Sequence, residues 1–419
     1  MTLRWRLTPS IGTVLINSFP QRENAKDPIN SFVGLGHSCL EQQRNTYSSL
    51  SLTDHTMLSS LSRQALRRSS SRKGAAFFSS APSTGRNVVV VSGVRLPFAQ
   101  SSTIYQDELA VDLQRMTITG LLTQTALPKD VIDYVICGNV IQEVKTSNIA
   151  REAAVNAGLP YDIGAHTVAQ ACISANAAIA TGAQQIRMGN ADVVLAGGVE
   201  TFSDLPIRLT RNIRQKLITL NKAMKKGGTV GAIQHMIKGL SAKDISLETP
   251  AIANFTTGEV MGVSSDKLSA KFGVSRQDQD EFTVRSHTLA QKAHDEGFYK
   301  EEIVPYKGST AENGIKGDST FESVSKLKPA FIKPHGTHTA ANSSYLTDGA
   351  AMSLLMSEEK AKELGYKPWA YLRDVSFKAC NPWDELLLGP TYCTSDILQR
   401  NNLSMEDMGV LEIHEGMYN

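Results

Sequence analysis

Short runs rich in β-branched residues alternate with segments of helical periodicity between residues 87 and 198, and this alternation constrains the fold most strongly. The strand-like runs span residues 87–92, 131–141, 165–171 and 191–198. The helical segments that separate them span residues 107–122, 147–158 and 173–188. Strands that alternate regularly with helices pack as layers around a sheet, so the sequence predicts an α/β fold.

The pattern changes near Leu205, where a basic segment begins. Residues 205–243 hold nine Lys or Arg and no Asp or Glu, interleaved with Leu, Ile and Met. Helical signals continue to residue 293, and strand-like runs return at 347–356 and 370–375. We therefore predict three parts, which are an α/β half at 87–205, a helical insertion at 206–326 and a second, incomplete α/β half at 327–419.

The first 86 residues differ in composition from the rest of the chain. No Asp or Glu occurs from His55 to Gln106, and residues 57–73 are rich in Arg and Ser, as mitochondrial transit peptides are. We predict a transit peptide at 57–86, with a disordered basic tail as the alternative. Residues 1–56 contain four acidic residues and no clear periodicity. We interpret them as a gene-model extension ahead of a true start at Met57, or as disordered.

The composition argues against several classes of protein. A net charge of +2 gives no reason to expect a nucleic-acid partner, and no apolar run reaches the roughly 18 residues of a membrane-spanning helix. The five cysteines include no C-x-x-C pair, so we expect neither a disulfide framework nor a metal site. A reducing compartment and one reactive thiol fit these cysteines better.

Cys172 is the candidate for that thiol because it lies where a predicted strand turns into a predicted helix. Free N–H groups and the partial positive charge of a helix N-terminus favour the thiolate, which is the nucleophilic form of cysteine. Small residues at 174–178 would let a substrate or a partner chain come close to the helix. On position alone, a buried structural cysteine is the more common alternative.

Several segments resemble the thiolase family. Gln170–Asn176 is similar to the segment that carries the thiolase nucleophile, and Gly197–Glu200 is similar to the strand and turn that follow it. Further similar segments are Glu259–Gly262, Thr339–Gly349 and Glu412–Glu415. The segments that most resemble the β-subunits of mitochondrial trifunctional β-oxidation complexes are 142–148, 326–334 and 387–391. The resemblance extends from about Asn87 to Glu415.

The resemblance implies a thiolase-like αβαβα layered fold with a helical insertion domain. It also implies an acetyl-CoA C-acyltransferase that cleaves 3-ketoacyl-CoA in fatty-acid β-oxidation. Cys172 would attack the keto carbon, cleavage would release acetyl-CoA, and a second coenzyme A would take the acyl group from the thioester. Within the matching segments, Met261 would contact the pantetheine arm, Ser344 would contact coenzyme A, and His414 would lie near the oxyanion site. Coenzyme A is then a co-substrate, and we expect no permanently bound cofactor.

Two thiolase segments, Gly-His-Pro and Cys-x-Gly-Gly-Gly, do not occur in this sequence. In the family, their His and Cys act as the base and the acid/base, and neither Cys380 nor Cys393 has a matching context. We predict that the other histidines are packing or surface residues, namely His166, His287, His294, His335 and His338. We therefore expect this chain to be truncated at its C-terminus and to be inactive or impaired.

The resemblance also implies partners and a location. We expect a mitochondrial matrix protein that forms a homodimer and binds the α-subunit of a trifunctional complex. Residues 205–243 would bind anionic lipid of the inner membrane, with a solvated helical face or a groove for the coenzyme A phosphates as alternatives. Two rival functions remain. One is a condensing enzyme of the ketoacyl-synthase kind, and the other is a non-catalytic protein that binds acyl-CoA or a subunit.

Overall fold

The computed structural model describes residues 13–18, 85–241, 244 and 246–417, the first six of them by their backbone alone. The predicted transit peptide therefore lies almost entirely outside the described residues. Within the segment 1–56, only the strand β1 (Thr13–Ser18) is described. Its six residues are a strand and not disordered, whereas their interpretation as a gene-model extension stays a prediction.

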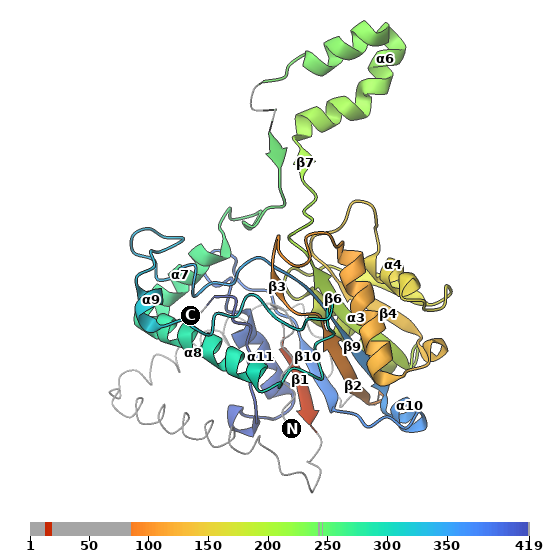
Figure 1. Ribbon diagram of the computed structural model, residues 1–419, viewed down its shortest axis with the longest axis vertical. Helices are drawn as coiled ribbons and strands as arrows, with labels where there is room; N and C mark the ends of the chain where they lie inside the picture. The colour runs from red at the N-terminus through yellow and green to blue at the C-terminus, as the bar shows by residue number, and fades with distance from the viewer. Residues whose placement is uncertain (1–12, 19–84, 242–243, 245, 418–419) are drawn as a thin grey trace, which may run out of the picture. The chain divides into compact units, whose positions relative to one another are not determined.

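One eight-stranded mixed sheet forms the centre of the fold (Figure 1). Its order is β1, β10, β2, β9, β6, β4, β5, with the short β3 (Ala99–Gln100) paired to β9. The remaining strands are β2 (Val88–Arg95), β4 (Tyr134–Gly138), β5 (Gly164–Val168), β6 (Val193–Glu200), β9 (Thr347–Ser357) and β10 (Ala370–Ser376). β4 is parallel to β5 and β6, whereas β9 is antiparallel to β2 and β6.

The predicted alternation of strands and helices is confirmed. Crossover helices follow the strands of the first half, as parallel strand pairs require. These helices are α3 (Ala110–Thr125), α4 (Ile149–Asn156) and α5 (Ser174–Arg187), with a short 3₁₀ turn η1 at Lys129–Val131. The α/β fold is therefore the one that the sequence predicted.

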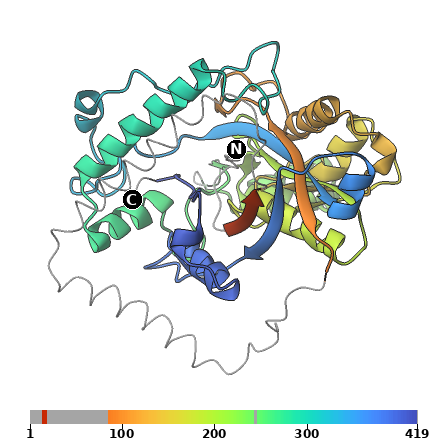
Figure 2. The same cartoon turned by 90° about the horizontal axis from the view of Figure 1, so that it is seen from below.

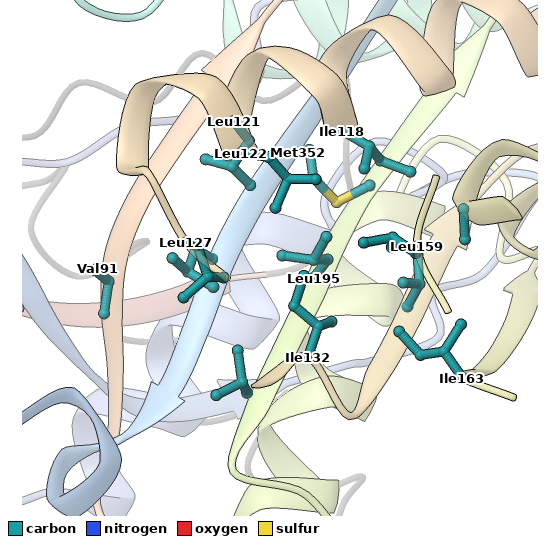
Figure 3. Packing of buried hydrophobic residues seen from close by; sticks show 14 of the residues in the cluster. Val91, Ile118, Leu121, Leu122, Leu127, Ile132, Leu159, Ile163, Leu195 and Met352 are labelled. Carbon is teal, nitrogen blue, oxygen red and sulfur yellow. The ribbon is translucent and has the colours of Figure 1, made fainter. Parts of the chain in front are cut away.

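Neighbouring strand residues belong to two different buried clusters, one on each face of the sheet. On one face, α3 and α4 pack over side chains that include Leu195 and Met352 (Figure 3). On the other face, α5 packs over side chains that include Val194 and Leu355. Successive residues of a strand point to opposite faces, so strands covered on both sides are apolar at nearly every position. This double covering explains the continuous apolar runs in the sequence.

Both strands that we expected in the second half join this same sheet. β9 lies between β2 and β6, and β10 pairs with the outer side of β2, where the two strands lie side by side in Figure 2. The predicted boundary at residue 327 therefore does not coincide with a new sheet. The helices around these strands are α10 (Glu358–Glu363) and α11 (Gly389–Arg400), followed by a 3₁₀ turn η3 at Met405–Asp407.

The segment between β6 and β9 carries helices and a pair of short strands, and the bounds 206–326 of the expected insertion stay a prediction. It contains β7 (Arg208–Leu209), α6 (Arg211–Ile237), β8 (Leu247–Glu248), α7 (Met261–Phe272), α8 (Arg276–Asp295) and α9 (Phe321–Ser325). Its later part returns to the sheet before β9. There the buried Arg95 guanidinium of β2 pairs with Glu302 at 2.8 Å and with Glu312 at 2.6 Å.

Candidate active site

Cys172 lies in a tight turn between β5 and α5. The residue before it, Ala171, has a left-handed φ of 47°, which costs a residue with a side chain about 1–2 kcal/mol. The Ser174 hydroxyl stabilises the turn because it accepts the Gln170 N–H at 2.8 Å and donates to the Ala171 carbonyl at 2.6 Å. The first turn of α5 therefore fixes the backbone on both sides of the cysteine.

Two glycines let the carboxyl ends of β4 and β6 approach the start of α5. A Cβ at Gly138 would lie 2.3–2.5 Å from backbone atoms of Ser174 and Ala175. A Cβ at Gly198 would lie 2.9 Å from the Gly138 carbonyl oxygen and 3.1 Å from Ala175 Cβ. Real Cβ atoms essentially never come within 3.0 Å of such atoms, so both positions require glycine in this backbone, Gly138 by a wide margin and Gly198 by a narrow one.

A half-buried carboxylate, that of Glu200, ties the ends of β4 and β6 together near Cys172. Glu200 accepts the backbone N–H groups of Val140 at 2.9 Å and Ile141 at 3.1 Å, and it accepts the Asn139 side-chain amide at 3.1 Å. Asn139 also donates to the Val199 carbonyl at 3.0 Å. Burial raises the pKa of Glu200, and these three donors partly oppose that rise.

The expected low pKa of Cys172 is wrong. Burial raises the pKa of the Cys172 thiol, its own backbone N–H opposes this rise, and the charge of Glu200 raises the pKa further. Cys172 also lies two residues before Ser174, where α5 begins, so the helix N-terminus acts on it less directly than expected. The side chain is partly exposed and not sealed within the core.

Met261 is the first residue of α7 and is 38% exposed. Next to it, a Cβ on Gly262 would lie 2.3 Å from three ring carbons of Phe331, so the loop before β9 packs directly on the first turn of this helix. Further along α7, the Asp266 carboxylate accepts the backbone N–H groups of Ile332 at 3.1 Å and Thr337 at 2.8 Å. Met261 thus lies where α7 meets this loop.

The segment that carries Ser344 pairs with the segment that follows His414. The Ser344 N–H donates to the Gly416 carbonyl at 2.9 Å, and Ser343 forms a β-bridge with Met417. Both Ser344 and His414 are exposed. Desolvation nevertheless lowers the pKa of His414, to about 4, so its imidazole is neutral at physiological pH.

The structure links three of the four predicted site residues. The loop that precedes β9 contacts α7 just beyond Met261, carries Ser344 and pairs with the segment after His414. No hydrogen bond or ion pair within the described residues joins Cys172 to any of these three. Glu200 lies in the thiolase-like segment Gly197–Glu200, and no local sequence signal predicts its contacts with the end of β4.

The part of the chain that the structure describes contains no group of three His, Cys, Asp or Glu side chains arranged to hold a metal ion.

Comparisons with known proteins agree with this architecture. The profile of the thiolase N-terminal domain matches residues 88–359, which include every strand of the sheet except β1 and β10. The human mitochondrial trifunctional enzyme subunit beta is 52% identical over 335 residues, which cover 79% of this chain and 69% of that protein. The 3-ketoacyl-CoA thiolase of Yersinia enterocolitica is 37% identical over 337 residues, which cover 79% and 76%.

A solved structure shows the same fold. The crystal structure of the Bacillus anthracis acetyl-CoA acetyltransferase superposes with a TM-score of 0.69 at 30% sequence identity, covering 80% of this chain and 82% of that chain. The predicted thiolase-like fold is therefore confirmed. Thiolases are acyltransferases that take coenzyme A as a substrate and hold no permanently bound cofactor. Since the family profile covers well over half of the chain and relatives match it over most of their own length, this chain belongs to the thiolase family.

Proposed function

We propose that the chain cleaves 3-ketoacyl-CoA by thiolysis in fatty-acid β-oxidation, with Cys172 as the nucleophile. The Cys172 sulfur attacks the keto carbon, and the carbon–carbon bond to the acetyl-CoA portion breaks. The enolate of acetyl-CoA takes a proton, and the acyl group stays on sulfur as a thioester. The thiol of a second coenzyme A then takes the acyl group and returns Cys172 to its free form.

The observation that carries this proposal is the strained, hydrogen-bonded turn at Cys172. A partly exposed thiol lies on a strained turn that Ser174 stabilises, and two glycines bring two strand ends against the helix behind it. Strain of this kind persists where the surroundings hold it, and it concentrates at functional sites. A purely structural cysteine would need none of these features.

The second part of the proposal is that the 419-residue chain completes this cycle slowly. Reaction requires the thiolate, and burial together with Glu200 raises the pKa of Cys172. His414 is neutral near pH 7 and is our candidate for the oxyanion site, where a neutral imidazole can donate one hydrogen bond. An added base would speed the first step, and in the family the Gly-His-Pro segment supplies one.

A thiolysis assay with acetoacetyl-CoA and coenzyme A tests this function. We expect a slow but measurable rate with the full chain and no rate above background with Cys172→Ser. The matched control is Cys393→Ser, because Cys393 is a fully buried thiol that the proposal does not use. Equal rates for wild type and Cys172→Ser would refute the assignment of the nucleophile.

The raised pKa of Cys172 favours a second candidate function, the binding of acyl-CoA or a subunit without turnover. The same assay separates the two functions. In a binder without turnover, coenzyme A would protect Cys172 against iodoacetamide, and no thiolysis would occur. The enzyme would show both the protection and the thiolysis.

We also propose that α6 binds anionic lipid. The helix bends at Gly227 and Gly228 into a hairpin, and the Lys216 ammonium donates to the His235 carbonyl at 2.8 Å and holds the two arms together. Large apolar side chains are exposed along both arms, among them Ile218 at 80%. These apolar side chains lie on a basic helix, and such helices bind membrane surfaces at about 1 kcal/mol per Lys or Arg near the surface.

Among the helices of the described residues, none has the length and apolar composition that crossing a membrane requires. Co-sedimentation with vesicles that contain cardiolipin tests the proposal. We expect Lys225→Gln with Lys226→Gln to weaken binding, and the matched pair Lys300→Gln with Lys367→Gln, two exposed lysines elsewhere, to leave it unchanged. Equal binding by both pairs would contradict the proposal.

The relatives suggest the setting of this function. Several of them are named as mitochondrial trifunctional enzyme subunits beta. We propose that this chain also acts in the mitochondrial matrix, forms a homodimer and binds an α-subunit of a trifunctional complex. Co-purification of a tagged full chain from mitochondria with an α-subunit tests that part, and its absence from mitochondria would contradict the proposal.

A further inference from the structure

A buried carboxylate on α7 gathers the loop that precedes β9. Asp266 is 5% exposed, and its Oδ1 accepts the backbone N–H groups of Thr337 at 2.8 Å and His338 at 3.0 Å. Its Oδ2 accepts the Ile332 N–H at 3.1 Å. One side chain thus satisfies three backbone donors of a loop that lies more than 60 residues away in sequence. Buried donors need such partners, so the loop conformation depends on this carboxylate.

His338 completes the cluster on the loop side. Its ring is fully buried, with Nδ1 2.8 Å from Asp266 Oδ1 and Nε2 2.9 Å from the Ser265 hydroxyl oxygen. A carboxylate only accepts hydrogen bonds, so Nδ1 donates to Asp266. Ser265 and Asp266 are adjacent on α7, and the imidazole therefore bridges two residues of that helix. His338 is more than the packing residue that the sequence predicted.

A second set of buried amides extends the same network to α8. Asn342 donates to the Thr337 carbonyl at 3.1 Å and to the Gln279 side-chain oxygen at 3.3 Å, and it accepts the Thr339 N–H at 2.6 Å. Gln279 in turn donates to Ser269 of α7 at 2.8 Å. The loop is therefore hydrogen-bonded to two helices immediately before Ser344. Met261 and Ser344 are both exposed, and each lies at an end of this buried hydrogen-bond network.

We propose that Asp266 and His338 are positioning residues that set the affinity for coenzyme A by fixing the loop that carries Ser344 against the helix that carries Met261. This inference rests on the proposed function, in which Met261 and Ser344 contact coenzyme A. Neither positioning residue touches the ligand in this proposal. Their effect comes from holding the two contact residues at one separation, which spares the ligand the entropic cost of ordering the loop.

The test is the concentration of coenzyme A that halves the rate of Cys172 alkylation by iodoacetamide. We expect His338→Ala to raise this concentration at least about tenfold, because a hydrogen bond to a charged group in a buried network is lost. We expect His338→Asn to stay near the wild-type value, since its amide can still donate to Asp266. Asp266→Asn should resemble His338→Ala, and alkylation without coenzyme A should be unchanged in all three.

The matched control is Asp133→Asn. Asp133 also accepts two backbone N–H groups, those of Asp192 at 2.7 Å and Val193 at 2.9 Å, but at the opposite end of the strands from Cys172. We expect it to leave the half-protecting concentration unchanged even if it lowers the melting temperature.

Three results would overturn the inference. They are a wild-type value for His338→Ala, an equal loss in His338→Asn, and an equal loss in the Asp133→Asn control. If Asp266→Asn fails to fold, the two His338 variants still decide the question. Wild-type protein that coenzyme A does not protect would instead refute the proposed function, and this inference with it.

Discussion

Gly138→Ala is the most direct perturbation of the packing that positions Cys172. The new Cβ would lie 2.3 Å from the Ser174 carbonyl carbon, 2.4 Å from Ala175 N and 2.5 Å from the Ser174 carbonyl oxygen. Ordinary van der Waals contact begins at 3.4 Å. All three atoms belong to the backbone, so no side-chain rotation relieves the overlap, and the start of α5 must move by about 1 Å relative to β4.

The expected cost has two components. Forcing an extra methyl group into a packed core destabilises a protein by about 1–3 kcal/mol, and we expect the free energy of unfolding to fall within that range. A displacement of about 1 Å in a reacting group can lower a rate by about 100-fold. We therefore expect acyl transfer to Cys172 to lose at least about tenfold in rate, and more if the turn at Ala171 moves with the helix.

The assay combines urea unfolding with the rate at which acetoacetyl-CoA acetylates Cys172, followed by mass spectrometry. Gly198→Ala is a graded variant, because its nearest contact is 2.9 Å and the required shift is smaller. Gly409→Ala is the matched control, since no atom lies within 4 Å of the new Cβ. If Gly138→Ala keeps the stability and the acetylation rate of the control, the packing of β4 on α5 does not position Cys172.

The remaining predictions concern groups around the same turn. Glu200→Gln removes a negative charge that raises the pKa of Cys172. The pH at half-maximal iodoacetamide labelling of Cys172 should therefore fall, and labelling at pH 7 should become faster. The control Glu363→Gln, a change at an exposed carboxylate, should leave both quantities unchanged. Ser174→Ala removes the acceptor of the Gln170 N–H, and the free energy of unfolding in urea should fall by about 0.5–2 kcal/mol. An unchanged midpoint and slope would show that the hydroxyl does not stabilise the turn.

Local periodicity was sufficient to predict most of the elements in this fold. The runs that became β2, β4, β5 and β6 are apolar at nearly every position because both faces of the sheet are covered. The helices between them carry their own 3.6-residue pattern. The signals that define a strand or a helix lie within the element itself, so one sequence suffices to find it.

The partners of each strand could not be predicted in the same way. We assigned β9 to a second half, but it pairs with β2 and β6, and β6 lies about 150 residues earlier in the chain. An apolar run records that a strand is covered on both faces and not which strand lies beside it. Pairing depends on how the whole chain packs, and the long helical insertion before β9 hid the continuity of the sheet.

The candidate site divides along the same line. The local sequence predicts that Cys172 lies between a strand and a helix, but it does not predict the direction of its pKa shift. That direction depends on burial and on Glu200, a charge 28 residues further along the chain. The pair of Asp266 and His338 is separated by 72 residues, and neither residue stands in a recognisable motif. Polar clusters assembled by tertiary contacts leave no periodic signal in sequence.

The most direct test of the central claim is to find which residue carries the acyl group after brief reaction of the full chain with acetoacetyl-CoA. The protein is quenched in acid, digested and analysed by mass spectrometry. Our account predicts an acetyl thioester on the peptide that contains Cys172, lost in Cys172→Ser and suppressed by prior alkylation. Folded protein that shows no adduct would contradict the account. So would an adduct on Cys380 that forms in Cys172→Ser at the same yield as in the wild-type protein.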